Sequence, residues 1–113
     1  MSAGRSKGGD GAQGLQLEFT WDPVKAAANL AKHGVAFAQG ATVFADALAL
    51  TVFDAGHSGF EERWFTLGMG SEGRLLAVSH THQASDAASA RARIISARAA
   101  TRKERRQYED GPR

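Results

Sequence analysis

The sequence contains no cysteine, which narrows the kinds of protein that it can encode. Disulfide frameworks and zinc sites built on thiolates are excluded. No stretch of about 18 apolar residues occurs, so we expect no membrane-spanning helix. Residues 1–14 contain five glycines and lack the apolar segment of a secretory signal, so we expect a flexible, Gly-rich tail. These features fit a cytoplasmic protein.

Sequence motifs of several enzyme classes are also missing. There is no Walker loop and no H-E-x-x-H zinc motif. What is present is a chain of 113 residues, of which 42% are hydrophobic. That length and composition predict one domain with its own core, over residues 15–110.

Charge is distributed unevenly along the chain. The net charge is +2, but residues 1–90 carry six basic and nine acidic side chains, whereas residues 91–113 carry eight basic and three acidic ones. A basic terminal segment favours a polyanion or an acidic protein as partner. An ordinary solvated basic helix explains the charge equally well.

The pattern of apolar residues predicts an α+β fold. Asp22, Pro23 and Gly34 have the positions of an N-cap, a first helical residue and a helix stop, and Thr101 with Glu104 forms a Thr-x-x-Glu capping box. Three consecutive strands with short links predict an antiparallel meander, in the order β-α-α-β-β-β-α. The strands of this order are expected at 15–21, 47–54, 61–69 and 73–82, and its helices at 22–35, 36–46 and about 102–109. A further strand is expected at 91–97, before the last helix.

The strand expected at 91–97 carries arginines at its margins. Regular alternation would place Arg91 and Arg93 on one face, and Arg98 on the other. Two neighbouring guanidinium groups suit a phosphate clamp, because their planar forks match phosphate oxygens. The alternative is a strand end that emerges into solvent.

The histidines offer acid–base chemistry more readily than metal binding. His80 and His82 share a strand face, as a pair of metal ligands does, but no third ligand is evident nearby. We therefore expect no metal site. His80 suits proton transfer, because an unperturbed imidazole has a pKa of about 6.5.

Three blocks of sequence resemble a known family. They are FTWDPVKAAANLAKHGVAF, the block HS-x-x-EER-W-x-T-x-G-x-x-x-x-GRLL-x-V-x-HT that starts at His57, and RIISARAATRKERRQYE, which together span about residues 18–109. Their order and spacing resemble the BrnT toxins of bacterial type II toxin–antitoxin systems. The resemblance implies a RelE-like α+β fold, RNA cleavage without a cofactor, and a neutralising antitoxin with a DNA-binding domain, through which the complex represses its operon at operator DNA.

The resemblance also directs the choice of site residues. We expect Arg63, Arg93 and Arg98 to stabilise the charge that develops on the phosphate during cleavage, and His80 to act as acid or base. The expected RNA-binding residues are Lys32, Arg91, Arg102, Arg105 and Tyr108. For Tyr108, anchoring of the last helix to the sheet is an alternative to stacking on a base.

A second function remains open from the sequence. A non-catalytic module that binds nucleic acid or a partner in operon repression would use the same basic terminus. An exposed sheet edge would allow addition of a partner strand or formation of a homodimer.

Overall fold

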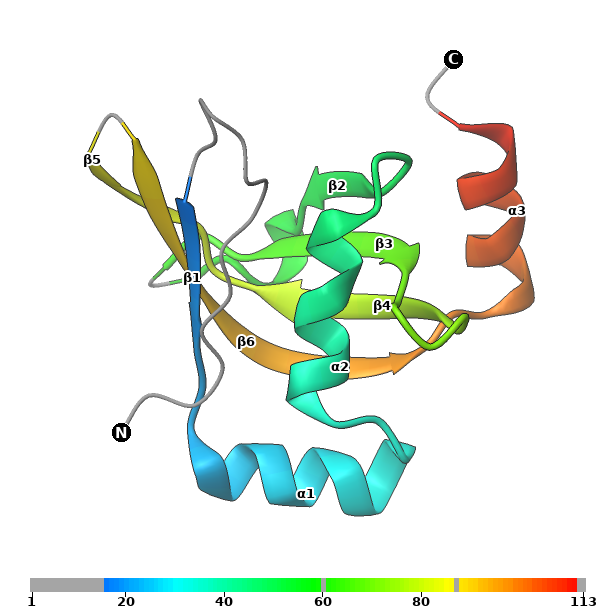
Figure 1. The fold of residues 1–113 in the computed structure, drawn as a ribbon, viewed down its shortest axis with the longest axis horizontal. Coiled ribbons are helices and arrows are strands. Elements are labelled where there is room, and N and C mark those ends of the chain that lie inside the picture. The colour runs from blue at the N-terminus through cyan, green and yellow to red at the C-terminus, as the bar shows by residue number, and fades with distance from the viewer. Residues whose placement is uncertain (1–15, 60, 87, 112–113) are drawn as a thin grey trace.

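The computed structural model describes residues 16–59, 61–86 and 88–111. The expected tail at residues 1–14 lies outside these ranges. Figure 1 shows an α+β arrangement in which a twisted sheet is flanked by helices, and this confirms the predicted class. No helix in the described ranges is both long and apolar enough to cross a membrane.

Helices lie on three sides of the sheet (Figure 1). The first, α1, follows its local signals: the Asp22 carboxylate accepts a hydrogen bond from the Val24 N–H at 2.8 Å, and the helix ends at Gly34, whose φ is +70°. Glycine adopts this left-handed conformation without strain, so the predicted stop is confirmed. The helical elements are α1 (Pro23–His33), α2 (Phe37–Ala41), the short 3₁₀ turns η1 (Thr42–Ala45) and η2 (Ala55–His57), and α3 (Arg102–Asp110).

The single helix expected over 36–46 is divided into α2 and η1. At its centre, Gly40 lies so close to the sheet that a Cβ there would be 3.0 Å from the Cβ of Ala97. Glycine therefore allows a close approach of α2 to the sheet, at the cost of a weaker helix.

The sheet is mixed. Its strands are β1 (Gln16–Thr20), β2 (Leu50–Phe53), β3 (Trp64–Met69), β4 (Leu75–His80), β5 (Gln83–Asp86) and β6 (Ser89–Ala99). Their spatial order is β1-β6-β4-β3-β2, with β5 paired to β6. The antiparallel meander β2-β3-β4 confirms the prediction. The expected element order is wrong, because β5 forms where no strand was expected. In addition, β1 pairs in parallel with β6, outside the meander.

The hairpin between β3 and β4 contains a misleading pattern. Gly68, Gly70 and Gly73 have the G-x-G-x-x-G spacing of a dinucleotide-binding loop. In the structure they lie on an antiparallel hairpin, so no helix N-terminus follows them to bind a pyrophosphate.

The two faces of the sheet pack against different helices. We call the first the α2 face; its core comprises Phe19, Val35, Phe37, Val43, Leu76, Val78, Ala92, Ile94 and Ala97. We call the second the α3 face; there Leu67, Leu75 and Ala77 pack with Tyr108 of α3. Because α3 contacts this face only near the ends of β3 and β4, side chains farther along β6 remain accessible.

The edge of β6 is shared by β1 and α1. Residues of β1 pair with β6 only as far as Arg93, and α1 then packs along the rest of the strand. The buried Asn29 side chain of α1 replaces the missing strand there: it donates to the Ala97 carbonyl at 2.8 Å and accepts from the Ala97 N–H at 3.2 Å. This arrangement brings the polar face of α1 beside β6.

Candidate active site

A β-bulge places the three arginines of β6 on the same face of the sheet. Ser79 pairs with Ser96 but His80 pairs with Ile94, so Ile95 has no partner across the strand pair. The extra residue resets the alternation of side chains. The expected placement of Arg93 and Arg98 on opposite faces is therefore wrong.

Burial confirms this shared orientation. Ala92, Ile94 and Ala97 all belong to the core of the α2 face. Their neighbours Arg93 and Arg98 therefore point to the α3 face. Five residues along a strand separate these arginines by about 16 Å, so each can serve a different part of one bound polynucleotide.

A basic pocket of about 210 Å³ lies where the start of α1 meets β6 and the segment before β3. Lys25, Arg63 and Arg93 line it, together with Asp22, Ile94 and Ile95. The Asp22 carboxylate is engaged as the cap of α1. Residues far apart in sequence thus bring three cationic side chains to one hollow.

Glu61 adds a carboxylate beside the basic pocket. We call Lys25, Glu61, Arg63 and Arg93 together the basic cluster. Arg93 donates a hydrogen bond and forms an ion pair with it. The hydrogen bond from Arg93 lowers the pKa of Glu61 below its ordinary value; desolvation opposes this shift, and the charges of Arg93, Arg63 and Lys25 support it. At neutral pH the group is a carboxylate, able to accept a proton amid positive charge.

Arg98 is held by α3. Its guanidinium donates two hydrogen bonds to the Glu104 carboxylate, at 2.8 and 3.0 Å, and lies over the Phe65 ring at 5.7 Å from the centroid. Glu104 also completes the predicted capping box, which is confirmed, because its side chain accepts from the Thr101 N–H at 2.9 Å. The last helix therefore fixes the position of one arginine on the α3 face.

Glu104 gives the fold a defined acid sensitivity. Arg98 lowers the pKa of Glu104 to about 2. A depressed carboxylate pKa stabilises the folded state above the unfolded pKa and loses that contribution as pH falls. We expect Glu104→Gln to lower the free energy of unfolding at pH 7 by about 1 kcal/mol. In urea titrations, the difference in free energy of unfolding between wild type and Glu104→Gln should disappear between about pH 4.5 and pH 2. The control Glu109→Gln, on the same helix, should match wild type at every pH.

His80 lies away from the arginines. It is only 1% exposed, on the α2 face, where its ring meets Phe44 edge-on. Its Nε2 is 2.7 Å from the Thr66 hydroxyl and its Nδ1 is 2.8 Å from the Thr81 carbonyl oxygen, so Nδ1 carries the proton and Nε2 accepts. Burial lowers the pKa of His80. This placement favours a structural role, and proton transfer by His80 stays an untested prediction.

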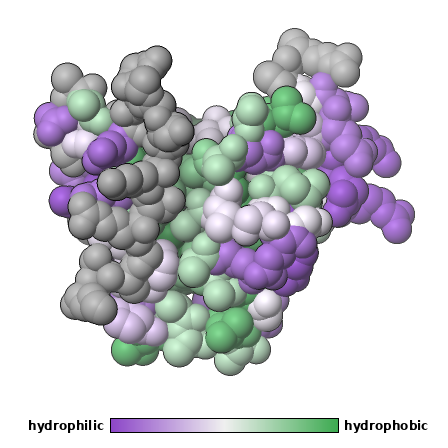
Figure 2. Space-filling view, viewed as in Figure 1, coloured by the Kyte–Doolittle hydropathy of each residue, from purple (hydrophilic) through white to green (hydrophobic). Residues whose placement is uncertain are grey.

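The predicted RNA-binding residues are dispersed. Arg91 lies 3.7 Å from Glu18, Lys32 lies on α1, and Arg102 and Arg105 are exposed on α3. Figure 2 shows hydrophilic residues gathered over α3 in that view. The Tyr108 hydroxyl donates to Asp46 at 2.6 Å and its ring packs in the core of the α3 face, which is the anchoring role considered as its alternative.

Two members of the basic cluster, Lys25 and Glu61, were not predicted as site residues. Glu61 and Arg63 are two residues apart, so on an extended chain they lie on one face, and this spacing was a signal for Glu61. A surface salt bridge accounts for the same spacing. Nothing local to Lys25 indicates that it lies beside Arg93. Within the described residues, no group of three or more histidines and carboxylates could hold a metal ion.

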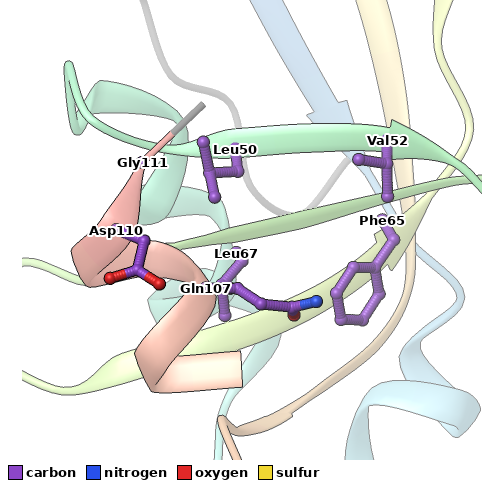
Figure 3. A pocket seen from close by; sticks show the side chains of 7 residues that line it. All are labelled: Leu50, Val52, Phe65, Leu67, Gln107, Asp110 and Gly111. Carbon is purple, nitrogen blue, oxygen red and sulfur yellow. The ribbon is translucent and has the colours of Figure 1, made fainter. Parts of the chain in front are cut away.

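Another hollow, between β2, β3 and α3, has a different character (Figure 3). It measures about 340 Å³, and Leu50, Val52, Phe65 and Leu67 project into it from the strands. Among the described residues that line it, Asp110 alone is charged. An apolar hollow with a carboxylate does not suit phosphate, so the basic pocket is the better candidate for RNA.

A family comparison agrees with an RNA-directed site. Residues 21–104 match the model of a family described as the ribonuclease toxin, BrnT, of type II toxin–antitoxin systems. Because the match covers most of the sequence, the chain belongs to the BrnT family, and the predicted resemblance is confirmed. Membership implies ribonuclease activity, an RNA substrate and an antitoxin partner. No curated protein matches the chain.

Proposed function

We propose that the protein is a metal-independent endoribonuclease whose active site is the basic pocket lined by Lys25, Arg63 and Arg93, together with Glu61, which is hydrogen-bonded to Arg93. The observation that carries the proposal is the Glu61 carboxylate beside the three cations of this pocket, whose own lining carboxylate, Asp22, is engaged in capping α1. RNA cleavage needs a proton acceptor for the 2′-hydroxyl and positive charge around the phosphate. This cluster contains both.

In the proposed reaction, Glu61 accepts the proton of the 2′-hydroxyl. The 2′-oxygen then attacks the adjacent phosphorus, forming a new P–O bond while the bond to the 5′-oxygen breaks. The products are a 2′,3′-cyclic phosphate and a 5′-hydroxyl, whose oxygen takes a proton from water. The hydroxide that remains takes the proton held by Glu61, which restores the carboxylate. Arg63, Arg93 and Lys25 stabilise the negative charge of the transition state, and Arg98 binds the same RNA farther along the α3 face.

The remaining parts of the proposal concern biology and fold relationship. The protein arrests growth by cleaving RNA, adopts a RelE-like fold, and is neutralised by an antitoxin whose DNA-binding domain recruits the complex to operator DNA. The alternative is a non-catalytic module acting in operon repression. It is supported by the exposed basic residues of α3, Arg102 and Arg105.

Incubation of the purified protein with a labelled single-stranded RNA, with and without EDTA, distinguishes these functions. The nuclease proposal predicts fragments with 2′,3′-cyclic phosphate ends at equal rates under both conditions. Intact RNA combined with retardation of operator DNA would support the alternative. Cleavage that EDTA abolishes would contradict metal independence.

A further inference from the structure

A second basic groove adjoins the proposed active site. It measures about 260 Å³ and runs between α1 and β6, with Lys25, Lys32 and His33 on the helix side and Ile95 and Ser96 on the strand side. Lys25 and Ile95 also line the basic pocket. The two hollows therefore adjoin at these residues, and together they extend from Arg93 towards the C-terminal end of α1.

The charge of this groove is of one sign. Its ionisable lining residues are Lys25, Lys32 and His33, and no carboxylate among the described residues lines it. Neither lysine forms an ion pair with another described residue within 4.0 Å. Seven residues on an α-helix span about 10.5 Å, and nearly two turns keep both lysines on one side. The result is an exposed pair of cations along one wall.

The wall contributed by β6 depends on Asn29. Because its amide is committed to the Ala97 backbone, α1 is held beside the strand at the level of Ile95 and Ser96. The groove therefore follows from how α1 replaces β1 at the strand edge.

We propose that the α1–β6 groove binds the backbone phosphates of the RNA strand that flanks the scissile phosphate, with Lys32 as the outermost contact. This inference rests on the proposed function for the identity of the bound strand. A cationic wall that continues from the site of cleavage suits a polyanion whose charges recur at regular intervals. Contacts to the backbone alone add affinity without selecting a base.

Binding and cleavage by Lys32→Ala test the proposal, with Lys103→Ala on α3 as the matched loss of one lysine. The binding probe is an RNA of about eight nucleotides with a 2′-deoxy substitution at the scissile position. We expect Lys32→Ala to weaken its binding about 5- to 10-fold and to reduce the salt slope by about one, and Lys32→Arg to restore most of the affinity. Lys103→Ala should bind this probe, and cleave the all-ribose form of the same RNA, as wild type does.

The outcomes separate this inference from the proposed function. If wild type cleaves RNA and Lys32→Ala binds the probe as tightly as Lys103→Ala does, the groove assignment is overturned while the nuclease stands. If Lys32→Ala binds the purified antitoxin more weakly and RNA as tightly as before, the groove belongs to the antitoxin, and the RNA proposal is also overturned. If wild type does not cleave the all-ribose form of this RNA, the proposed function itself fails.

Discussion

Arg93→Ala should slow single-turnover cleavage of RNA about 100- to 1,000-fold, the usual result of losing one group that stabilises transition-state charge. Arg93 lines the basic pocket and is hydrogen-bonded to Glu61, so its removal lowers the positive charge there and frees the proposed base from its partner. Arg93→Lys keeps the charge but loses the planar fork, and should have an intermediate rate.

Arg106→Ala is the matched control for Arg93→Ala, because it removes an exposed arginine from α3, away from the pocket. It should cleave within about twofold of wild type, since isolated surface substitutions change little. Equal activity of the Arg93 and Arg106 variants, with both proteins folded by circular dichroism, would exclude Arg93 from the reaction.

Glu61→Gln should reduce the cleavage rate about 100- to 10,000-fold, which is the range for loss of a general base. Glutamine keeps the size of the side chain and can still accept a hydrogen bond from Arg93, but it cannot take the proton of the 2′-hydroxyl. Glu62→Gln changes the adjacent exposed carboxylate in the same way and should retain the wild-type rate. A normal rate for Glu61→Gln would remove the base from the proposed mechanism.

The pH dependence of kcat/KM gives a second readout of Glu61. Because Arg93 lowers the pKa of Glu61, the acid limb of the wild-type profile should lie below the ordinary glutamate value of 4.5. Removing Arg93 should move that limb upwards, since the hydrogen bond that favours the carboxylate is lost. If the acid limb of the kcat/KM profile lies at the same pH in Arg93→Ala as in wild type, that limb belongs to another group.

Local signals in the sequence were enough to predict much of the secondary structure. Asp22, Pro23 and Gly34 bound α1, and the capping box of Thr101 and Glu104 starts α3. These features depend on neighbouring residues, so they can be read without knowledge of the fold. By contrast, β5 has a small, polar sequence and forms a strand through its pairing with β6.

The candidate site was harder to predict, because its geometry depends on long-range pairing. The alternation rule assigned Arg93 and Arg98 to opposite faces, and only the register of β4 against β6 reveals the bulge at Ile95. The meeting of Lys25 with Arg63 and Arg93 likewise requires the packing of α1 along the edge of β6. His80 illustrates the converse: its residue type suggested proton transfer, while its burial on the α2 face favours a structural role.

The most direct test of the central claim is to map the RNA-binding surface in solution. A non-cleavable RNA with a 2′-deoxy substitution at the scissile position would be titrated into ¹⁵N-labelled protein. The proposed site predicts the largest amide shifts around Glu61, Arg63, Arg93 and Ile95, continuing along α1. Amide shifts confined to β2, β3 and α3, around the apolar hollow of Figure 3, would contradict the proposed site.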